Sequence, residues 1–143
     1  MTAQLPLSGC QRRLALLWVS AALALFLVLI AQSILGKYGA SSERAWAWFL
    51  PTILPTVSLI VGAVISGAKN ALAGETVDRF AYRVSFGLSV FYLVLVATVP
   101  LVQPLTSRTP LELMELSNLW LGPVQGLVAL SLGAYFVSGR QSG

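Results

Sequence analysis

The sequence has no histidine, a single cysteine and few charges. Charged residues make up only 10% of the 143 residues, whereas hydrophobic residues make up 57%; soluble domains carry about a quarter charged residues. Without histidine there is no imidazole to bind a metal or act as a general base, and one cysteine cannot form a CxxC pair or an intramolecular disulfide. The shortage of charge excludes an ordinary water-soluble surface, so lipid is the expected solvent.

Acidic residues are scarce as well, and their positions argue against chemistry inside the membrane. All five lie outside the long apolar stretches, whereas proton-coupled transporters usually place an ionisable residue within the bilayer. There is no glycine-rich phosphate loop, and no nucleophile with a visible activating base. We therefore expect no catalytic residues, no metal site and no cofactor, and we expect that the chain is not an enzyme.

Four apolar stretches reach the length of about 20 residues that a helix needs to cross a bilayer. They cover residues 14–35, 45–68, 84–102 and 119–137, and the nine basic and five acidic residues all fall between them or at the chain ends. The mean hydropathy of +0.81 fits the same class. The sequence predicts an all-α membrane protein with one domain, residues 1–143, built as a bundle of four transmembrane helices.

Local signals mark two helix boundaries. Gly36 follows the first apolar stretch and suits a helix C-terminus. Residues 109–112 (Thr-Pro-Leu-Glu) have the form of a capping box with proline at the first helical position. The amphipathic segment that follows predicts a short interfacial helix over about 110–120. The Gly122-Pro123 pair then permits a kink where the fourth span turns into the membrane.

Lysine and arginine are unevenly divided between the two sides of the predicted bundle. With a cytoplasmic N-terminus, six basic residues lie inside and three lie outside: Arg12, Arg13, Lys69, Arg79, Arg83 and Arg140 against Lys37, Arg44 and Arg108. The positive-inside rule then favours cytoplasmic N- and C-termini. We expect an integral protein of a bacterial inner (plasma) membrane. We expect no nucleic-acid partner, because the net charge of +4 is explained by this distribution.

Small residues recur at helical spacing in three of the spans. Helices in lipid associate through close packing and interhelical hydrogen bonds, so small residues mark their interfaces. The candidate packing positions are Gly62 and Ser66 in the second span and Gly122, Gly126 and Gly133 in the fourth. The third span has a similar stripe of Ser85, Ser89 and Tyr92. We expect these faces to serve packing within one chain, with packing between chains as the alternative.

Polar side chains gather in the predicted outer half of the spans. They are Gln32, Thr52, Thr56, Gln103, Asn118 and Gln125. Pro51 and Pro55 lie one turn apart there, and each leaves a backbone carbonyl that needs another partner in lipid. One interpretation is a polar pocket for a small ligand or an ion. The other is simple hydrogen bonding between helices near the membrane interface.

The pair Arg79 and Arg83 lies on one helical face at the start of the third helix. The two guanidinium groups suit contact with anionic lipid headgroups. The alternative is an anchor that obeys the positive-inside rule, with side chains that extend to the interface.

Two functions remain after these exclusions. The first is helix–helix assembly, in which the chain forms an oligomer or a subunit of a larger membrane complex, with lipid and other membrane helices as partners. The second is an oligomeric channel, pore-forming effector or small-solute facilitator that uses the polar, proline-rich outer half. A membrane enzyme would have to build its site from Arg108, Glu112 and Glu115, which more often solvate a surface.

Overall fold

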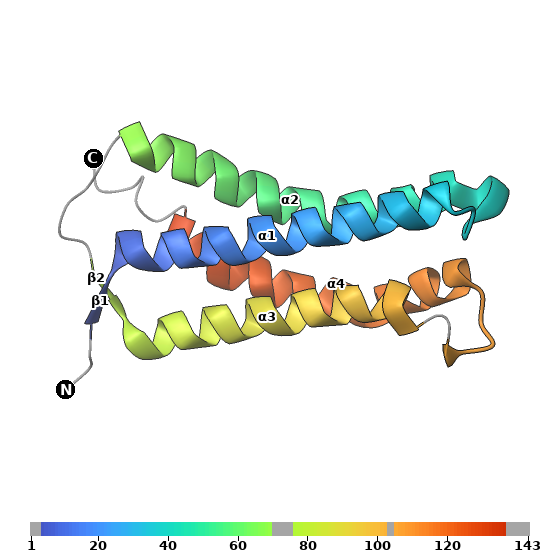
Figure 1. Ribbon diagram of the computed structural model, residues 1–143. Coiled ribbons are helices and arrows are strands. Elements are labelled where there is room, and N and C mark those ends of the chain that lie inside the picture. The colour runs from blue at the N-terminus through green and yellow to red at the C-terminus, as the bar shows by residue number, and fades with distance from the viewer. Residues whose placement is uncertain (1–3, 70–75, 103–104, 137–143) are drawn as a thin grey trace.

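Four long helices dominate the fold (Figure 1). The computed structural model describes residues 4–69, 76–102 and 105–136. In chain order the elements are β1 (Gln4–Pro6), α1 (Leu7–Ile34), the 3-10 turn η1 (Gly39–Ser41), α2 (Ser42–Lys69), β2 (Thr76–Asp78), α3 (Arg79–Val102) and α4 (Pro110–Phe136). Residues 35–41 and 105–109 lie at one end of the bundle, here named the turn end, and β1 and β2 lie at the other, the strand end (Figure 1).

Three helices are long and apolar enough to cross a membrane. The stretches are Ser8–Ile34, Gly39–Gly62 and Arg79–Val102, and they correspond to the first three predicted spans. The fourth predicted span, 119–137, coincides with α4 but ends outside the described residues, and the described part of α4 is not among these three. The fold is therefore helical with three candidate transmembrane helices, which supports a membrane protein.

The turn between α1 and α2 follows the predicted helix end at Gly36. This glycine has φ +75°, a left-handed conformation that carries no penalty without a Cβ. The amide of Lys37 donates to the carbonyl of Gln32 at 3.0 Å, and that of Gly36 donates to Ser33 at 3.2 Å. These two bonds form a Schellman motif, and the chain reverses there to run α2 back alongside α1.

The predicted capping box at the start of α4 is confirmed. The amide of Thr109 donates to Oε2 of Glu112 at 3.1 Å, and the amide of Glu112 donates to Oγ1 of Thr109 at 3.3 Å. The two reciprocal bonds satisfy donors that the first helical turn leaves free.

The rest of α4 differs from the prediction of a separate interfacial helix over 110–120. The structure has a single helix from Pro110 to Phe136 that continues through Gly122 and Pro123. Met114 and Ser117, in its first half, are 2% and 0% exposed. This half is therefore packed into the bundle rather than laid on a surface, and the packing keeps it in line with the second half.

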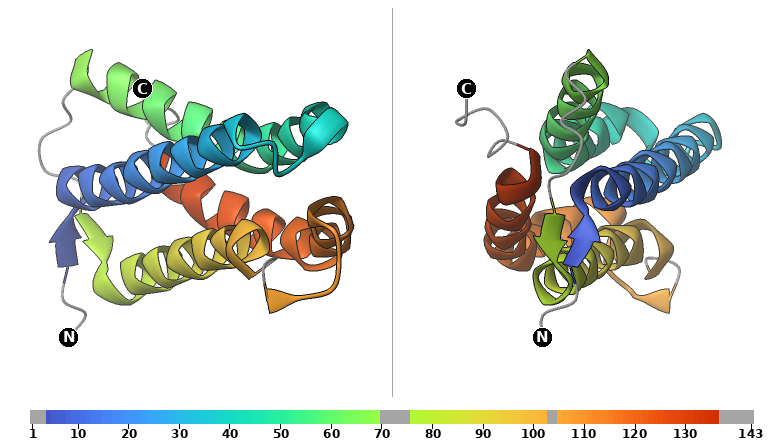
Figure 2. Two further views of the ribbon diagram at one scale, coloured as in Figure 1. Left: turned by 45° about the vertical axis from the view of Figure 1, so that its right-hand side comes forward. Right: turned by 90° about the vertical axis from the view of Figure 1, so that its left-hand side faces the viewer.

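All four helices contribute to a common core, seen from the strand end in the right-hand view of Figure 2. Trp18 of α1, Ile53 of α2, Tyr92 of α3 and Leu132 of α4 are each at most 2% exposed. The centroids of the Trp18 and Tyr92 rings are 5.8 Å apart. Ser85 and Ser89 are buried on the same face of α3 as Tyr92, so the predicted stripe of the third span packs inward.

A short antiparallel pair of strands joins the two halves of the chain at the strand end. Gln4 pairs with Asp78, Leu5 with Val77 and Pro6 with Thr76. The sequence analysis predicted no strand in either segment. Because β1 leads directly into α1 and β2 into α3, the pairing holds the first turns of these two helices side by side (Figure 1).

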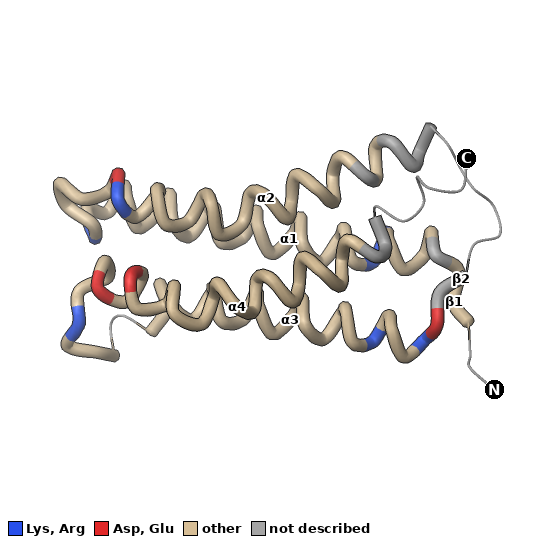
Figure 3. The backbone as a smooth tube through the Cα atoms, turned by 180° about the vertical axis from the view of Figure 1, so that it is seen from behind, with Lys and Arg blue, Asp and Glu red and all other residues tan. Residues whose placement is uncertain are grey.

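The charged residues of the described ranges lie toward the two ends of the bundle, and the middle of the helices has none (Figure 3). Arg44, Arg108, Glu112 and Glu115 are at the turn end, whereas Arg12, Arg79 and Arg83 are near the strand end. Charge at both ends of apolar helices is the pattern that a bilayer requires.

Candidate functional site

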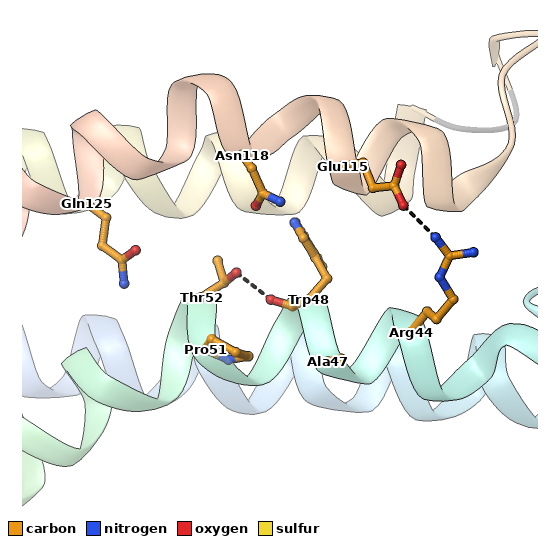
Figure 4. Close-up of a pocket in the computed structure, with 8 residues that line it drawn as sticks. All are labelled: Arg44, Ala47, Trp48, Pro51, Thr52, Glu115, Asn118 and Gln125. Carbon is orange, nitrogen blue, oxygen red and sulfur yellow. Dashed lines mark hydrogen bonds and ion pairs between the residues drawn. The ribbon is translucent and has the colours of Figure 1, made fainter.

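A groove of about 440 Å³ lies between α2 and α4 near the turn end (Figure 4). Both helices turn polar side chains toward it. The lining residues are Arg44, Ala47, Trp48, Pro51 and Thr52 from α2 and Glu115, Asn118 and Gln125 from α4. The groove is on the side of the bundle rather than along its axis, because Trp18 and Tyr92 fill the axis.

An ion pair bridges the groove at its charged end. Nη2 of Arg44 lies 2.6 Å from Oε1 of Glu115, and the two side chains are 65% and 67% exposed. A pair this exposed contributes about 0–1 kcal/mol to stability. It uses one of the five N–H donors of the guanidinium and one of the two carboxylate oxygens, so both groups can bind further partners.

The wall of the groove is fixed by the buried indole of Trp48. Its Nε1 donates to Oγ of Ser117 at 3.0 Å, and this hydroxyl donates to the carbonyl of Met114 at 2.6 Å. Thr52 Oγ1 donates in turn to the carbonyl of Trp48. The first bond joins α2 to α4, and the other two hold the hydroxyls of Ser117 and Thr52 against their own helices.

The proline-containing stretch of α2 is tied to α3. Pro55 has no N–H to offer the carbonyl of Pro51 four residues earlier. Beside it, the carbonyl of Thr52 accepts a hydrogen bond from the hydroxyl of Tyr92 at 2.8 Å. A buried tyrosine thus ties this stretch of α2 to α3 through the carbonyl next to the one that Pro55 leaves free.

The predicted polar pocket divides into separate environments. Thr52, Asn118 and Gln125 line the groove. Thr56 is buried, with 5% of its surface exposed, and does not line it. Gln32 lies on α1 and binds Pro100 and Tyr38. Gln103 is outside the described residues.

Two charged residues of the groove were not predicted as part of the polar pocket, because Arg44 was expected between two spans and Glu115 on a separate interfacial helix. In the structure Arg44 lies in the first turn of α2, and Glu115 lies in the second turn of α4. Their helical spacing to Trp48 and Asn118 was a signal that could have placed them on the same faces. Their approach across 71 positions of the chain was not readable from the sequence.

A second polar cluster closes the C-terminus of α3 at the turn end. The carbonyl of Pro100, in the last turn of α3, accepts hydrogen bonds from Lys37 Nζ at 3.1 Å and from Gln32 Nε2 at 3.5 Å. The hydroxyl of Tyr38 donates to Gln32 Oε1. A cation suits the negative end of a helix dipole. Burial lowers the pKa of Lys37 and raises the pKa of Tyr38 to about 12.

The glycines of the predicted packing faces are uncovered. A Cβ built on Gly62, Gly122, Gly126 or Gly133 would meet no neighbouring atom within 4 Å. These glycines therefore make no close helix–helix contact within the described part of the chain, contrary to the expectation of packing within one chain. The side chain of Ser66 is outside the described set. Packing between chains is the alternative that stays open.

The predicted lipid-contacting pair, Arg79 and Arg83, is exposed on the first turns of α3, and Phe80 between them is 74% exposed. Within the described ranges, no group of three or more His, Cys, Asp and Glu side chains could hold a metal ion.

No protein-family model matches this chain, and neither a curated protein nor a solved structure matches it.

We expect Tyr38→Phe to weaken the cluster at the end of α3 and to change its pH dependence. At neutral pH the variant leaves Gln32 Oε1 without its donor, which costs about 1–3 kcal/mol. Because the pKa of Tyr38 is raised in the folded state, folded protein holds this proton when unfolded protein has lost it. The stability that Tyr38 contributes is therefore present below pH 10 and lost as the pH rises toward 12.

The measurement is the free energy of unfolding in detergent at a series of pH values, for the wild type and Tyr38→Phe. The difference between the two proteins should shrink above pH 10, the ordinary pKa of tyrosine. A constant difference across that range would contradict the burial of the hydroxyl in the folded protein.

Proposed function

We propose that this chain is a small multi-pass membrane protein that acts through helix–helix assembly, as an oligomer of identical chains or as a subunit of a larger membrane complex. In this proposal α4 is the fourth span, both termini are cytoplasmic, and the location is a bacterial inner membrane. The observation that carries it is the uncovered glycine face on α4, with Gly62 on α2.

The contrast between exposed helix faces supports assembly. The outward surface of α3 has large apolar side chains such as Phe80, Phe91 and Val94, which suit contact with lipid tails. The outward surface of α4 also has exposed leucines, such as Leu119 and Leu130, but Gly122, Gly126 and Gly133 form one helical face beside them. Lipid contact does not require glycine, whereas close approach of another helix backbone does.

The basic residues support the proposed orientation. Arg12, Arg79 and Arg83 are near the strand end, where the positive-inside rule puts the cytoplasm. With this orientation Arg79 and Arg83 would reach anionic headgroups of the inner leaflet, so membrane lipid is the second proposed partner.

A channel, pore-forming effector or small-solute facilitator is the second candidate. The polar groove favours it, since Thr52, Asn118 and Gln125 come together there. The filled axis of the bundle weighs against a passage through one chain, because Trp18 and Tyr92 are fully buried in it. A pore would therefore need several chains arranged around their grooves.

We expect Gly126→Leu to weaken assembly about tenfold or more without harming the single chain. No atom lies within 4 Å of the Cβ position, and replacing a helical glycine raises helix propensity by about 0.8–1 kcal/mol. The added side chain would instead block the approach of a neighbouring helix, and a loss of about 1.4 kcal/mol weakens association about tenfold. Mild-detergent extracts of native membranes, separated on a native gel, measure the assembled fraction.

The matched control is Gly87→Leu. Gly87 is a helical glycine on α3 with equally open surroundings, but it is the single glycine of that helix, so no glycine face extends from it. The Gly87→Leu variant should leave the assembly intact. Assembly that survives Gly126→Leu as well as Gly87→Leu would rule out the α4 face as the interface.

The pore candidate makes a different prediction at Thr56. A water-filled passage through the polar outer half would expose this residue, whereas the assembly proposal keeps it buried, at 5% exposure. In a Cys10→Ser background, Thr56→Cys should resist a membrane-impermeant thiol reagent during the time in which Glu43→Cys on the exposed surface reacts fully. Equal labelling of the two would favour the pore.

A further inference from the structure

The groove between α2 and α4 holds polar groups that no other residue of the described ranges satisfies. Arg44 has four N–H donors beyond the one given to Glu115, and Glu115 has a second carboxylate oxygen. The side chains of Asn118 and Gln125 make no hydrogen bond with another described residue, although both face the groove (Figure 4). Donors and acceptors are therefore available along its whole length.

Because of where the groove lies, leaving these hydrogen-bonding groups without partners costs free energy. It opens on the side of the bundle, and Gln125 lies ten residues beyond Glu115 on α4, or about 15 Å along the helix axis. The polar lining thus extends from the charged turn end toward the apolar middle of the bundle. An amide that faces hydrocarbon without a partner is unfavourable, so a polar occupant would stabilise this face.

The arrangement of charges selects the chemistry of that occupant. Arg44 offers forked N–H donors that suit a phosphate, whereas Glu115 across the groove offers a carboxylate oxygen that suits an ammonium group. A purely anionic group would be repelled by Glu115, and a purely cationic group by Arg44. The two amides provide both donors and acceptors for ester or hydroxyl oxygens deeper in the groove.

We propose that the groove between α2 and α4 binds a phosphoethanolamine group, with its phosphate at Arg44 and its ammonium at Glu115, while Asn118 and Gln125 bind the glycerol ester oxygens when the group belongs to a phospholipid. The volume of about 440 Å³ lies within the range of small-molecule sites. The exposed ion pair is weak, so its two side chains separate readily to admit the ligand.

This site goes beyond the proposed assembly and does not depend on it. The residues that line the groove include none of the uncovered glycines. The phosphoethanolamine group has two possible sources, the headgroup of phosphatidylethanolamine in the bilayer and a soluble ester that enters from the water.

The test is ligand retention in native mass spectrometry of the full chain. The purified protein is equilibrated in nanodiscs of phosphatidylethanolamine, phosphatidylcholine or phosphatidylglycerol, and separately in detergent with soluble phosphoethanolamine. The wild type should retain phosphatidylethanolamine over the other two lipids, because phosphatidylcholine has no N–H to donate to Glu115 and phosphatidylglycerol has no cation. Arg44→Gln and Glu115→Gln should each weaken retention about tenfold, the effect of one lost charged contact.

Arg108→Gln and Glu43→Gln are the matched controls, since both remove an exposed charge at the turn end outside the groove. They should bind as the wild type does. Gln125→Leu is a second groove variant that should fold normally, because an apolar side chain is compatible with a surface that faces lipid. It removes an amide of the site, so retention of phosphatidylethanolamine should be weaker than in the wild type.

Each outcome decides the proposal. Selective retention of phosphatidylethanolamine that is lost in the groove variants supports it with lipid as the source. Binding of soluble phosphoethanolamine alone, with the same dependence on Arg44 and Glu115, supports it with a soluble source. Equal retention of all three lipids, no binding in any arm, or binding that the groove variants leave unchanged would overturn it.

Discussion

Polar groups on apolar helices must find partners within the protein, and this requirement accounts for most of the bonds that join the helices. The hydroxyl of Tyr92 supplies a donor to the proline-containing stretch of α2, and Lys37 and Gln32 supply donors to the last turn of α3. In water these groups would be solvated without help, whereas in lipid each would cost free energy if left alone. The indole N–H of Trp18 is an exception, with no partner among the described residues.

Helix α2 is hydrogen-bonded to each of the other three helices. Its tryptophans donate to Ser33 of α1 and Ser117 of α4, and its backbone accepts from Tyr92 of α3. These contacts lie in its first half, toward the turn end. Beyond them, Gly62 has open surroundings. The described part of the bundle is therefore tied by hydrogen bonds at the turn end, and the glycines of α2 and α4 farther on are uncovered.

The sequence was sufficient for features that depend on local chemistry. Gly36 and the capping box at Thr109 were predicted because helix ends need particular residue types at fixed positions. The first three spans followed from their apolar length, and the inward face of α3 followed from its periodicity. Features that depend on tertiary contact were not accessible. A glycine seam looks the same whether it faces the same chain or another one, and three-residue strands such as β1 are too short to leave a periodic signal.

The candidate site shows the same division. Thr52, Asn118 and Gln125 were identified as a polar layer, since such residues are unusual within spans. That they share one groove with Arg44 and Glu115 depends on how α2 and α4 pack, and the continuous course of α4 through Pro123 decides that packing.

The most direct test of the account is the mass of the particle extracted from native membranes in mild detergent, from light scattering with the detergent contribution subtracted. The account predicts a discrete mass well above the 15.2 kDa of one chain. A particle with the mass of a single chain would contradict it.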